Sequence, residues 1–201
     1  MTVTVGYRLA NWDTPLWASP NRRESRYGRR GGVVQYWSLH PLTPWAEQLR
    51  FQNVRDAGEA WELWQRPWAA QLMLPDDVLE LSFENAAAHG LAPDALVDDD
   101  WSRCQTWSAA FRGSGLMVPS AALPGTTNVV MFGPFVRSRY GLAPLDPTVD
   151  LPCDPVAELA TVPTDVLGHV RWLGDPHDGY AAWLAGRPSP DPPMVTAGRS
   201  E

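Results

Sequence analysis

The sequence predicts a single domain of the α+β class. Short runs of β-branched and aromatic residues are scattered among helix-like segments, without the regular strand–helix alternation of a parallel α/β fold. The chain has 201 residues, of which 44% are hydrophobic and 19% are charged. A soluble chain of this length buries about 70% of its unfolded surface, so one globular domain is expected.

The N-terminal part of the chain predicts two strands separated by a long loop. Residues 2–10 alternate loosely between polar and apolar types and indicate the first strand. Residues 11–31 are rich in Pro, Asn, Arg and Gly and indicate a loop, and loops of that length are uncommon unless they are functional. Residues 33–38 are β-branched and aromatic, which predicts a short buried strand.

A helix follows the second strand and carries a carboxylate near its start. We expect it to begin at Thr43 and Pro44 and to run to about residue 54, with Glu47 in or just beyond its first turn. Threonine can cap a helix, and proline tolerates the first helical position because its missing N–H would be unpaired there. Residues 59–65 are expected to form a second short helix or an exposed connection.

The middle of the chain adds strands and one longer helix. Four strands are predicted, at residues 68–74, 78–83, 116–119 and 127–132. The turn signals Pro75-Asp76-Asp77 and Pro124-Gly125 separate the members of each successive pair. Residues 84–100 are expected to be an irregular connection. A helix at residues 101–112 is predicted to be capped by Asp100 and closed by the next glycine.

The last third of the chain is rich in proline, which breaks any long element. We expect residues 1–139 to form the functional core and residues 140–186 to pack on it as a proline-rich part. Residues 187–201 contain few apolar side chains and are predicted to be a disordered tail. Within the proline-rich part, residues 166–173 predict a strand and residues 177–185 a short helix.

The charge pattern argues against a protein that binds nucleic acid. The net charge is −7, whereas the surfaces of nucleic-acid-binding proteins are usually basic. Five of the 16 basic residues nevertheless fall in one short segment: Arg22, Arg23, Arg26, Arg29 and Arg30. A basic segment in an acidic protein indicates a local anion site, and a solvated charged loop is the alternative interpretation.

The sequence shows no membrane span and no secretory leader. No stretch approaches the roughly 18 apolar residues of a span, and the first residues lack the basic and apolar regions of a signal peptide. Cys104 and Cys153 form neither a disulfide framework nor a metal motif, and the four histidines do not form a metal set. We therefore expect a cytoplasmic protein with reduced thiols and no metal.

Three residue types converge on one kind of ligand. Arg26 lies in the basic loop, Tyr36 near the end of a strand and Glu47 on the following helix. Arginine grips phosphate with two N–H groups, and tyrosine offers a ring for stacking. The set therefore fits an anionic ligand with a planar ring, and the carboxylate needs a positive partner or a developing positive charge. Taken singly, each residue has an ordinary structural explanation.

The same residues resemble the core of the RES domain, a family of bacterial toxins that consume NAD⁺. Arg26, a Gly, Tyr36, Ser38 and Glu47 fall in the register of the family pattern, although Gly28 stands where the family has Asn and Glu24-Ser25 replaces a glycine pair. A second block resembles the latter half of the domain: Asp100-Trp101, Gln105, residues 115–121 and Asn128. Both blocks occur in the expected order and cover about residues 6–135.

The resemblance implies a compact mixed sheet with flanking helices, similar to ADP-ribosyltransferases, and cleavage of NAD⁺ by hydrolysis or phosphorolysis. NAD⁺ would be the substrate, with no other cofactor. Glu47 would be the main catalytic carboxylate, Arg26 would bind phosphate or anchor the pocket, and Tyr36 would contact the nicotinamide side. Ser120 would hydrogen-bond the substrate or hold Glu47 in place.

The resemblance also implies two further substrate-binding candidates and a set of partners. Arg8 is a second phosphate candidate, and Gln105 is a polar residue near the site for which packing is an equal alternative. A cognate antitoxin is expected, with inorganic phosphate as a candidate acceptor and no nucleic acid or membrane partner. An inactive binding protein on the same fold and an ADP-ribosyltransferase acting on a macromolecule stay open, as does homo-oligomerisation.

Overall fold

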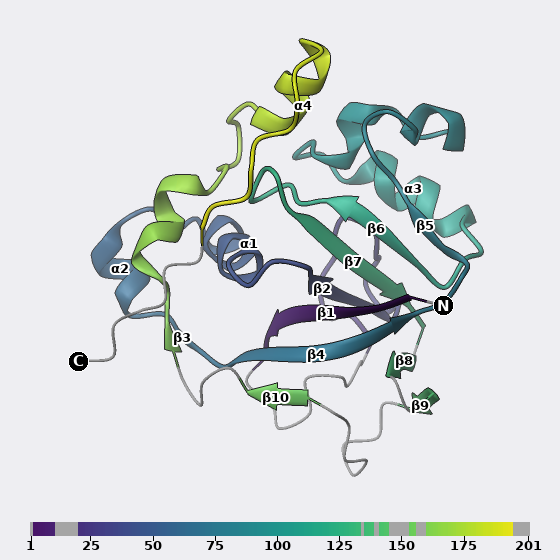
Figure 1. Cartoon of the computed structure of the whole chain (residues 1–201), viewed down its shortest axis with the longest axis horizontal. Coiled ribbons are helices and arrows are strands. Elements are labelled where there is room, and N and C mark those ends of the chain that lie inside the picture. Colours follow the sequence, from purple (N-terminus) through teal and green to yellow (C-terminus); the bar gives the residue numbers. More distant parts are fainter. Residues whose placement is uncertain are drawn as a thin grey trace.

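The computed structural model describes residues 2–10, 20–133, 135–138, 141–144, 153–155 and 160–194 (Figure 1). Its strands are β1 (Thr2–Leu9), β2 (Val34–Ser38), β3 (Trp64–Gln65), β4 (Pro67–Leu74), β5 (Val78–Glu80), β6 (Gly115–Pro119), β7 (Thr127–Phe132), β8 (Phe135–Ser138), β9 (Gly141–Pro144), β10 (Cys153–Pro155) and β11 (Ala160–Thr161). Its α-helices are α1 (Thr43–Gln52), α2 (Ala57–Trp61), α3 (Ser102–Ala110) and α4 (Asp178–Leu184). Its 3₁₀ helices are η1 (Ala86–His89), η2 (Pro93–Leu96) and η3 (Thr164–His169).

One large mixed sheet organises the molecule. Its strands follow the order β5-β6-β7-β2-β1-β4-β8-β9, and β10 also pairs with β4. The β5–β6 pair is parallel, and the other pairs in this sheet are antiparallel. In Figure 1, α1, α2 and η3 gather near one end of the strands, and α3 lies near β5 and β6. The predicted α+β class with a mixed sheet and flanking helices is confirmed.

Alternation along β2 gives the sheet two different faces. Gln35 and Trp37 are each 1% exposed and point to one side, where Trp37 packs with Leu72 and Val129. Because successive side chains of a strand point to opposite faces, Tyr36 and Ser38 point to the other side. That second face carries the cavity described below.

Helix α1 is anchored to the core by one apolar face. Trp45, Ala46 and Leu49 are at most 3% exposed and join a core cluster with Leu123 and Val166. The helix ends at Asn53, whose left-handed conformation (φ 54°) is typical of a helix C-terminus.

The predicted threonine cap was wrong. Leu42 occupies the cap position, and no side chain caps this helix. The Thr43 hydroxyl instead donates to Thr126 Oγ1 at 2.9 Å, and the Thr126 hydroxyl donates to the Leu123 carbonyl at 2.7 Å. The Thr43 hydroxyl therefore makes a tertiary hydrogen bond instead of capping the helix.

The predicted strand at residues 166–173 was also wrong, because η3 covers its first half and no strand follows in its second half. Val166 and Val170 are both buried and pack in the core cluster under α1. The strand predicted at residues 78–83 is shorter than expected and ends at Glu80, and the irregular connection after it contains η1 and η2. The strand at residues 166–173 was predicted from its β-branched residues alone, and the packing of these residues was not visible in the sequence.

The helix predicted at residues 101–112 is confirmed with shorter limits as α3. Asp100 accepts a hydrogen bond from the Ser102 backbone N–H at 2.9 Å, although Trp101 holds the formal cap position. The short helix predicted at residues 177–185 is confirmed as α4, and its cap is the His177 side chain.

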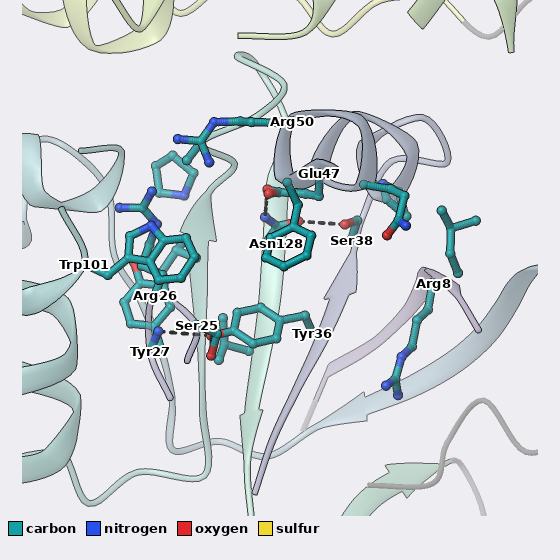
Figure 2. Close-up of a pocket in the computed structure, with 18 of the residues that line it drawn as sticks. Arg8, Ser25, Arg26, Tyr27, Tyr36, Ser38, Glu47, Arg50, Trp101 and Asn128 are labelled. Atoms are coloured by element: carbon teal, nitrogen blue, oxygen red, sulfur yellow. Dashed lines mark hydrogen bonds between the residues drawn. The ribbon is translucent and has the colours of Figure 1, made fainter. Parts of the chain in front are cut away.

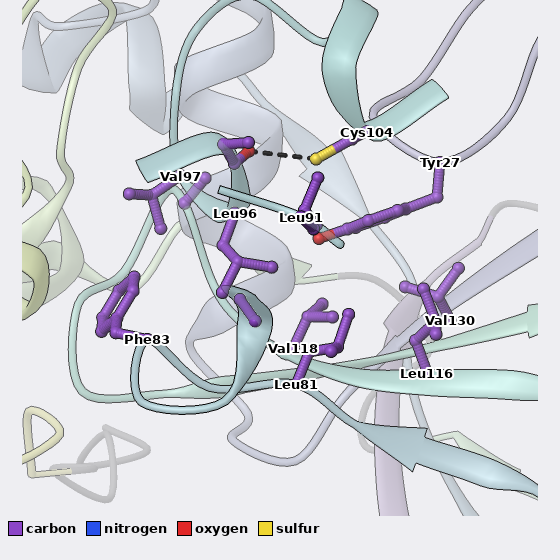
Figure 3. Packing of buried hydrophobic residues seen from close by; sticks show 13 residues of the cluster. Tyr27, Leu81, Phe83, Leu91, Leu96, Val97, Cys104, Leu116, Val118 and Val130 are labelled. Carbon is purple, nitrogen blue, oxygen red and sulfur yellow. Dashed lines mark hydrogen bonds between the residues drawn. The ribbon is translucent and has the colours of Figure 1, made fainter. Parts of the chain in front are cut away.

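A second core cluster lies beneath η1, η2 and α3 (Figure 3). It joins Tyr27 from the long loop to Leu96, Cys104 and Leu116. Burial raises the pKa of the Cys104 thiol, which donates to the Ala95 carbonyl at 3.0 Å. The cluster therefore ties the long loop to the sheet and to α3.

After residue 139 the structure describes residues 141–144, 153–155 and 160–194. Val162 and Val170 from the last of these ranges are buried in the cluster under α1. Residues 187–194 contain no regular element, and the Pro190 carbonyl lies only 2.3 Å from the point a Cβ on Gly125 would occupy. The rest of the predicted tail, and residues 140, 145–152 and 156–159 of the proline-rich part, lie outside the described residues.

Replacement of Leu49 by alanine tests the anchoring of α1. Leu49 is fully buried, so Leu49→Ala should lower the free energy of unfolding by about 2–5 kcal/mol. Urea unfolding followed by circular dichroism measures this loss. Leu184→Ala, at a side chain that is 64% exposed, should change it by less than about 0.5 kcal/mol. Equal losses in the two variants would contradict the assigned core.

Candidate active site

A cavity of about 510 Å³ opens over the second face of the sheet (Figure 2). This volume falls in the range of about 300–1,000 Å³ that is typical of small-molecule sites. Its lining comes from β1, β2, β6, β7, the loop at residues 24–27 and α1, together with Trp101 and Leu173. The cavity is therefore built where segments from most of the chain meet.

Strand register sets the floor of this cavity. Ser38 pairs with Asn128 across β2 and β7, and Asn128 pairs with Val118 across β7 and β6. Residues opposite one another point to the same face of a sheet. The polar pair Ser38 and Asn128 therefore lies on the face that carries Tyr36.

Helical spacing sets one wall. Pro44, Glu47, Arg50 and Phe51 all line the cavity, at intervals of three, three and one residues. Side chains separated by three and four residues share one face of a helix. The opposite face of α1 is buried, so the helix must turn Glu47 and Arg50 toward the cavity.

The Glu47 carboxylate is held by two donors from other elements. Ser120 Oγ and Asn128 Nδ2 both donate to Glu47 Oε1, at 2.9 Å each. The Ser38 hydroxyl donates to Asn128 Oδ1 at 2.6 Å, which fixes the orientation of the amide. No hydrogen bond to Oε2 is found within the described residues, so a ligand could contact this oxygen. The carboxylate is positioned before any substrate arrives.

The Tyr36 hydroxyl shapes the loop on the other side of the floor. It accepts a hydrogen bond from the Tyr27 backbone N–H at 3.0 Å and donates to Ser25 Oγ at 2.9 Å. Burial raises the pKa of Tyr36 to about 12 against the lowering effect of the hydrogen bonds with Ser25 and Tyr27. The phenol is therefore protonated at neutral pH and acts as a donor and a brace, while its ring lines the cavity.

Three residues of one wall carry N–H groups that lack partners within the described structure. These atoms are Arg26 Nη2, Arg50 Nε and Trp101 Nε1, and all three residues line the cavity. In Figure 2, Arg26, Arg50 and Trp101 lie on the same side of Glu47. A buried donor without a partner costs about 1–3 kcal/mol, so an anionic ligand that accepts these bonds would be favoured.

Asp99 holds Arg50 in this wall. Its Oδ1 pairs with Arg50 Nη2 and with Arg171 Nη1, the latter at 2.6 Å, and its Oδ2 accepts from the Gly174 N–H at 2.6 Å. Burial by itself raises the pKa of Asp99, but Gly174 and the two arginines outweigh it and hold the pKa below its ordinary value. Burial lowers the pKa of Arg50, and Glu47 opposes that effect.

The structure brings some, but not all, of the candidate site residues predicted from the sequence to one place in the cavity. Arg26, Tyr36 and Glu47 line one cavity, and Ser120 lies fully buried behind Glu47. Arg8 also lines the cavity, but its guanidinium lies 5.8 Å from the Trp37 ring centroid, on the far side of Glu47 from Arg26 in Figure 2. Gln105 is outside the cavity lining and donates to Glu24 and to the Ser25 carbonyl.

Sequence reasoning missed the roles of three residues that the structure brings to the site. Asn128 was part of the family resemblance but was given no role, Arg50 follows Glu47 by one helical turn, and Asp99 precedes the predicted cap of α3. The spacing of Glu47 and Arg50 on a predicted helix is the one signal that could have linked them. The contacts of Asp99 and Asn128 span 49 and 81 residues of chain and leave no local signal.

Two negative findings apply to the part of the chain that the structure describes. It holds no group of three or more His, Cys, Asp or Glu side chains placed to bind a metal ion. It also holds no helix with the length and apolar character that a membrane crossing requires.

Comparisons with known proteins address the family and the fold of this chain. The model of the family described as RES domain matches residues 6–154. Among solved structures, the chain is similar to a chain of the M. tuberculosis MbcT–MbcA toxin–antitoxin complex, with 18% identity and a TM-score of 0.54. The match covers 85% of this chain and 90% of that chain, and at this identity it shows the fold alone. No curated protein matches the chain.

Replacement of Tyr36 by phenylalanine tests the brace of the loop. Tyr36→Phe removes the acceptor of the Tyr27 N–H and the donor to Ser25, so the free energy of unfolding should fall by about 1–3 kcal/mol. Amide hydrogen exchange at Tyr27 should become faster. Tyr7→Phe removes a hydroxyl from the same cavity lining and should have an effect below about 0.5 kcal/mol. Unchanged exchange at Tyr27 would rule out the brace.

Proposed function

The chain belongs to the RES domain family, and on that basis we propose that it is an enzyme that cleaves the bond between nicotinamide and ribose in NAD⁺. The observation that carries the proposal is the Glu47 carboxylate, held by Ser120 and Asn128 in a cavity that is also lined by arginines and aromatic rings. NAD⁺ is the substrate in this proposal, and the chemistry needs no further cofactor.

The cavity offers complementary groups to each part of NAD⁺. The unpaired N–H groups of Arg26 and Arg50 suit the phosphate oxygens, since arginine binds phosphate with charge-assisted hydrogen bonds. Tyr36 and Trp101 supply aromatic surface for planar rings. Glu47 Oε2 then faces the positive nicotinamide ribose. Phosphates beside the arginines and a positive ribose beside Glu47 match the charges of this dinucleotide.

The chemical step follows from these charges. When the C1′–N1 bond breaks, its electron pair leaves with nicotinamide, which departs as a neutral ring. The ribose is left with oxocarbenium character, and a fixed carboxylate beside it stabilises that charge as in glycoside cleavage. An oxygen of water or of inorganic phosphate then bonds to C1′, and any proton it loses passes to Glu47 or to solvent. A macromolecular acceptor would use the same first step.

We also propose a biological role as the toxin of a toxin–antitoxin pair in the cytoplasm, since the MbcT–MbcA complex of similar fold is a toxin–antitoxin complex. An antitoxin would act by covering the cavity. Phe51 and Leu173 line its mouth and are 54% and 47% exposed, and Arg23 lies 5.6 Å from the Phe51 ring centroid. A partner with apolar and acidic groups would fit this rim.

Replacement of Glu47 by glutamine tests the proposed reaction. Glu47→Gln keeps the shape of the side chain but removes its charge, so turnover of NAD⁺ should fall about 10²–10³-fold. Release of nicotinamide by purified protein free of any partner measures this change, in buffers with and without phosphate. A product that is phosphorylated at C1′ in phosphate buffer would identify phosphate as the acceptor.

Glu62→Gln is the control, because Glu62 is exposed and lies outside the cavity lining. It should retain the rate of the unaltered protein. Absence of turnover by folded protein in both buffers would refute the enzyme proposal, and tight NAD⁺ binding in that case would indicate an inactive binding protein. Label from NAD⁺ that appears on protein would indicate a macromolecular acceptor.

A further inference from the structure

Ser120 has every hydrogen-bonding group engaged. Its backbone N–H donates to the Thr126 carbonyl at 2.9 Å. Its hydroxyl oxygen accepts from the backbone N–H groups of Ala122 and Leu123, at 3.2 and 3.1 Å. A serine hydroxyl has one proton and two lone pairs, so its proton is left for Glu47 Oε1. The position of the Ser120 backbone therefore decides where the Glu47 carboxylate is held.

The remaining group of Ser120 is its carbonyl oxygen, and His177 engages it. His177 Nε2 lies 2.9 Å from this oxygen, and His177 Nδ1 accepts the Tyr180 backbone N–H at 3.1 Å as the cap of α4. Because Nδ1 is an acceptor, the proton of the neutral ring must lie on Nε2, which donates to Ser120. Burial and the nearby Arg171 lower the pKa of His177, while Ser120 opposes them, so the ring is neutral at neutral pH.

His177 is itself rigidly seated. It is 5% exposed and lies edge-on to Phe83, with ring centroids 5.9 Å apart and planes inclined by 69°. Tyr180 and Trp183 of the same helix also pack around Phe83, at 5.4 and 6.0 Å. Phe83 belongs to the core cluster of Figure 3, so α4 is anchored on the core of the domain.

We propose that His177 is a positioning residue for Glu47, acting through the backbone and hydroxyl of Ser120. The residue lies beyond position 154, where the family match ends, so the C-terminal part would complete the active site rather than merely cover the core. The chain of contacts runs from α4 through Ser120 to the carboxylate on α1. The kinetic part of this proposal rests on the proposed cleavage of NAD⁺.

A role limited to capping α4 is the competing explanation. In that case the loss of His177 would lower stability without a selective effect on turnover. The two explanations differ in what happens at Ser120, Ala122 and Leu123. If His177 holds Ser120, its removal must loosen the two N–H groups that the Ser120 hydroxyl accepts.

Two variants of His177 separate these explanations. His177→Leu removes the donor to Ser120, and His177→Gln retains an N–H donor at a similar reach. His177→Leu should lower kcat for nicotinamide release about 10- to 100-fold with KM within about twofold, since small misplacements of a reacting group cost this much. His177→Gln should recover most of the rate.

Trp183→Phe is the matched control, because Trp183 packs on the same Phe83 from the same helix without reaching Ser120. It should leave kcat within about twofold. Equal losses of kcat in Trp183→Phe and His177→Leu, or an unchanged kcat in folded His177→Leu, would overturn the proposal.

Amide hydrogen exchange gives a readout that needs no activity. In folded His177→Leu the amides of Ala122 and Leu123 should exchange about 10-fold faster or more, and in Trp183→Phe they should not. If the unaltered protein fails to turn over NAD⁺, the proposed function fails, and the exchange rates still decide the role of His177. Unchanged exchange at both amides in His177→Leu would refute it.

Discussion

The hydrogen bond from the Ser120 hydroxyl to the Glu47 carboxylate connects two parts of the molecule on which the site depends. Glu47 is carried by α1, and Ser120 begins the turn between β6 and β7. A second hydrogen bond, from Thr43 at the start of α1 to Thr126, joins the same helix and the same turn. A side-chain hydrogen bond contributes only about 1 kcal/mol in isolation. Here several such bonds meet in one buried turn, and the bonds of such a network strengthen one another.

Charge balance supports the proposal that an anion binds beside Glu47. Arg50 and Arg171 share Asp99, so two positive charges meet one negative charge. Arg26 donates to the carbonyl of Ala95, and no ion pair to a carboxylate is found for it within the described residues. Among the charged side chains that line the cavity, Arg8, Arg26 and Arg50 outnumber Glu24 and Glu47 by one positive charge. Like charges that are held together by the fold cost free energy, and binding of an anion between them recovers it.

Sequence patterns could find the parts of the site that obey local rules. The alternation of residues 33–38 places Tyr36 and Ser38 on one face, and the helix start places Glu47 close behind them. The partners of those residues come from turns and strands far along the chain, and local spacing carries no signal for them. This is why His177 was expected only as the start of a helix, and why the hydroxyl of Thr43 was assigned to a cap. The strand expected at residues 166–173 failed for the same reason, because packing under α1 overrode β-propensity.

The two departures from the family pattern depend on each other. The Ser25 hydroxyl accepts from Tyr36 and donates to the Gly28 carbonyl at 3.2 Å, so it braces the turn that presents Arg26. A Cβ at position 28 would lie 2.9 Å from that hydroxyl and 2.9 Å from a methyl group of Val34, closer than side chains normally approach. Gly28 is therefore the residue that leaves room for Ser25 to reach Tyr36. A side chain at position 28 would crowd the Ser25 hydroxyl and Val34, so the contact between Ser25 and Tyr36, which braces the turn that presents Arg26, depends on glycine at this position.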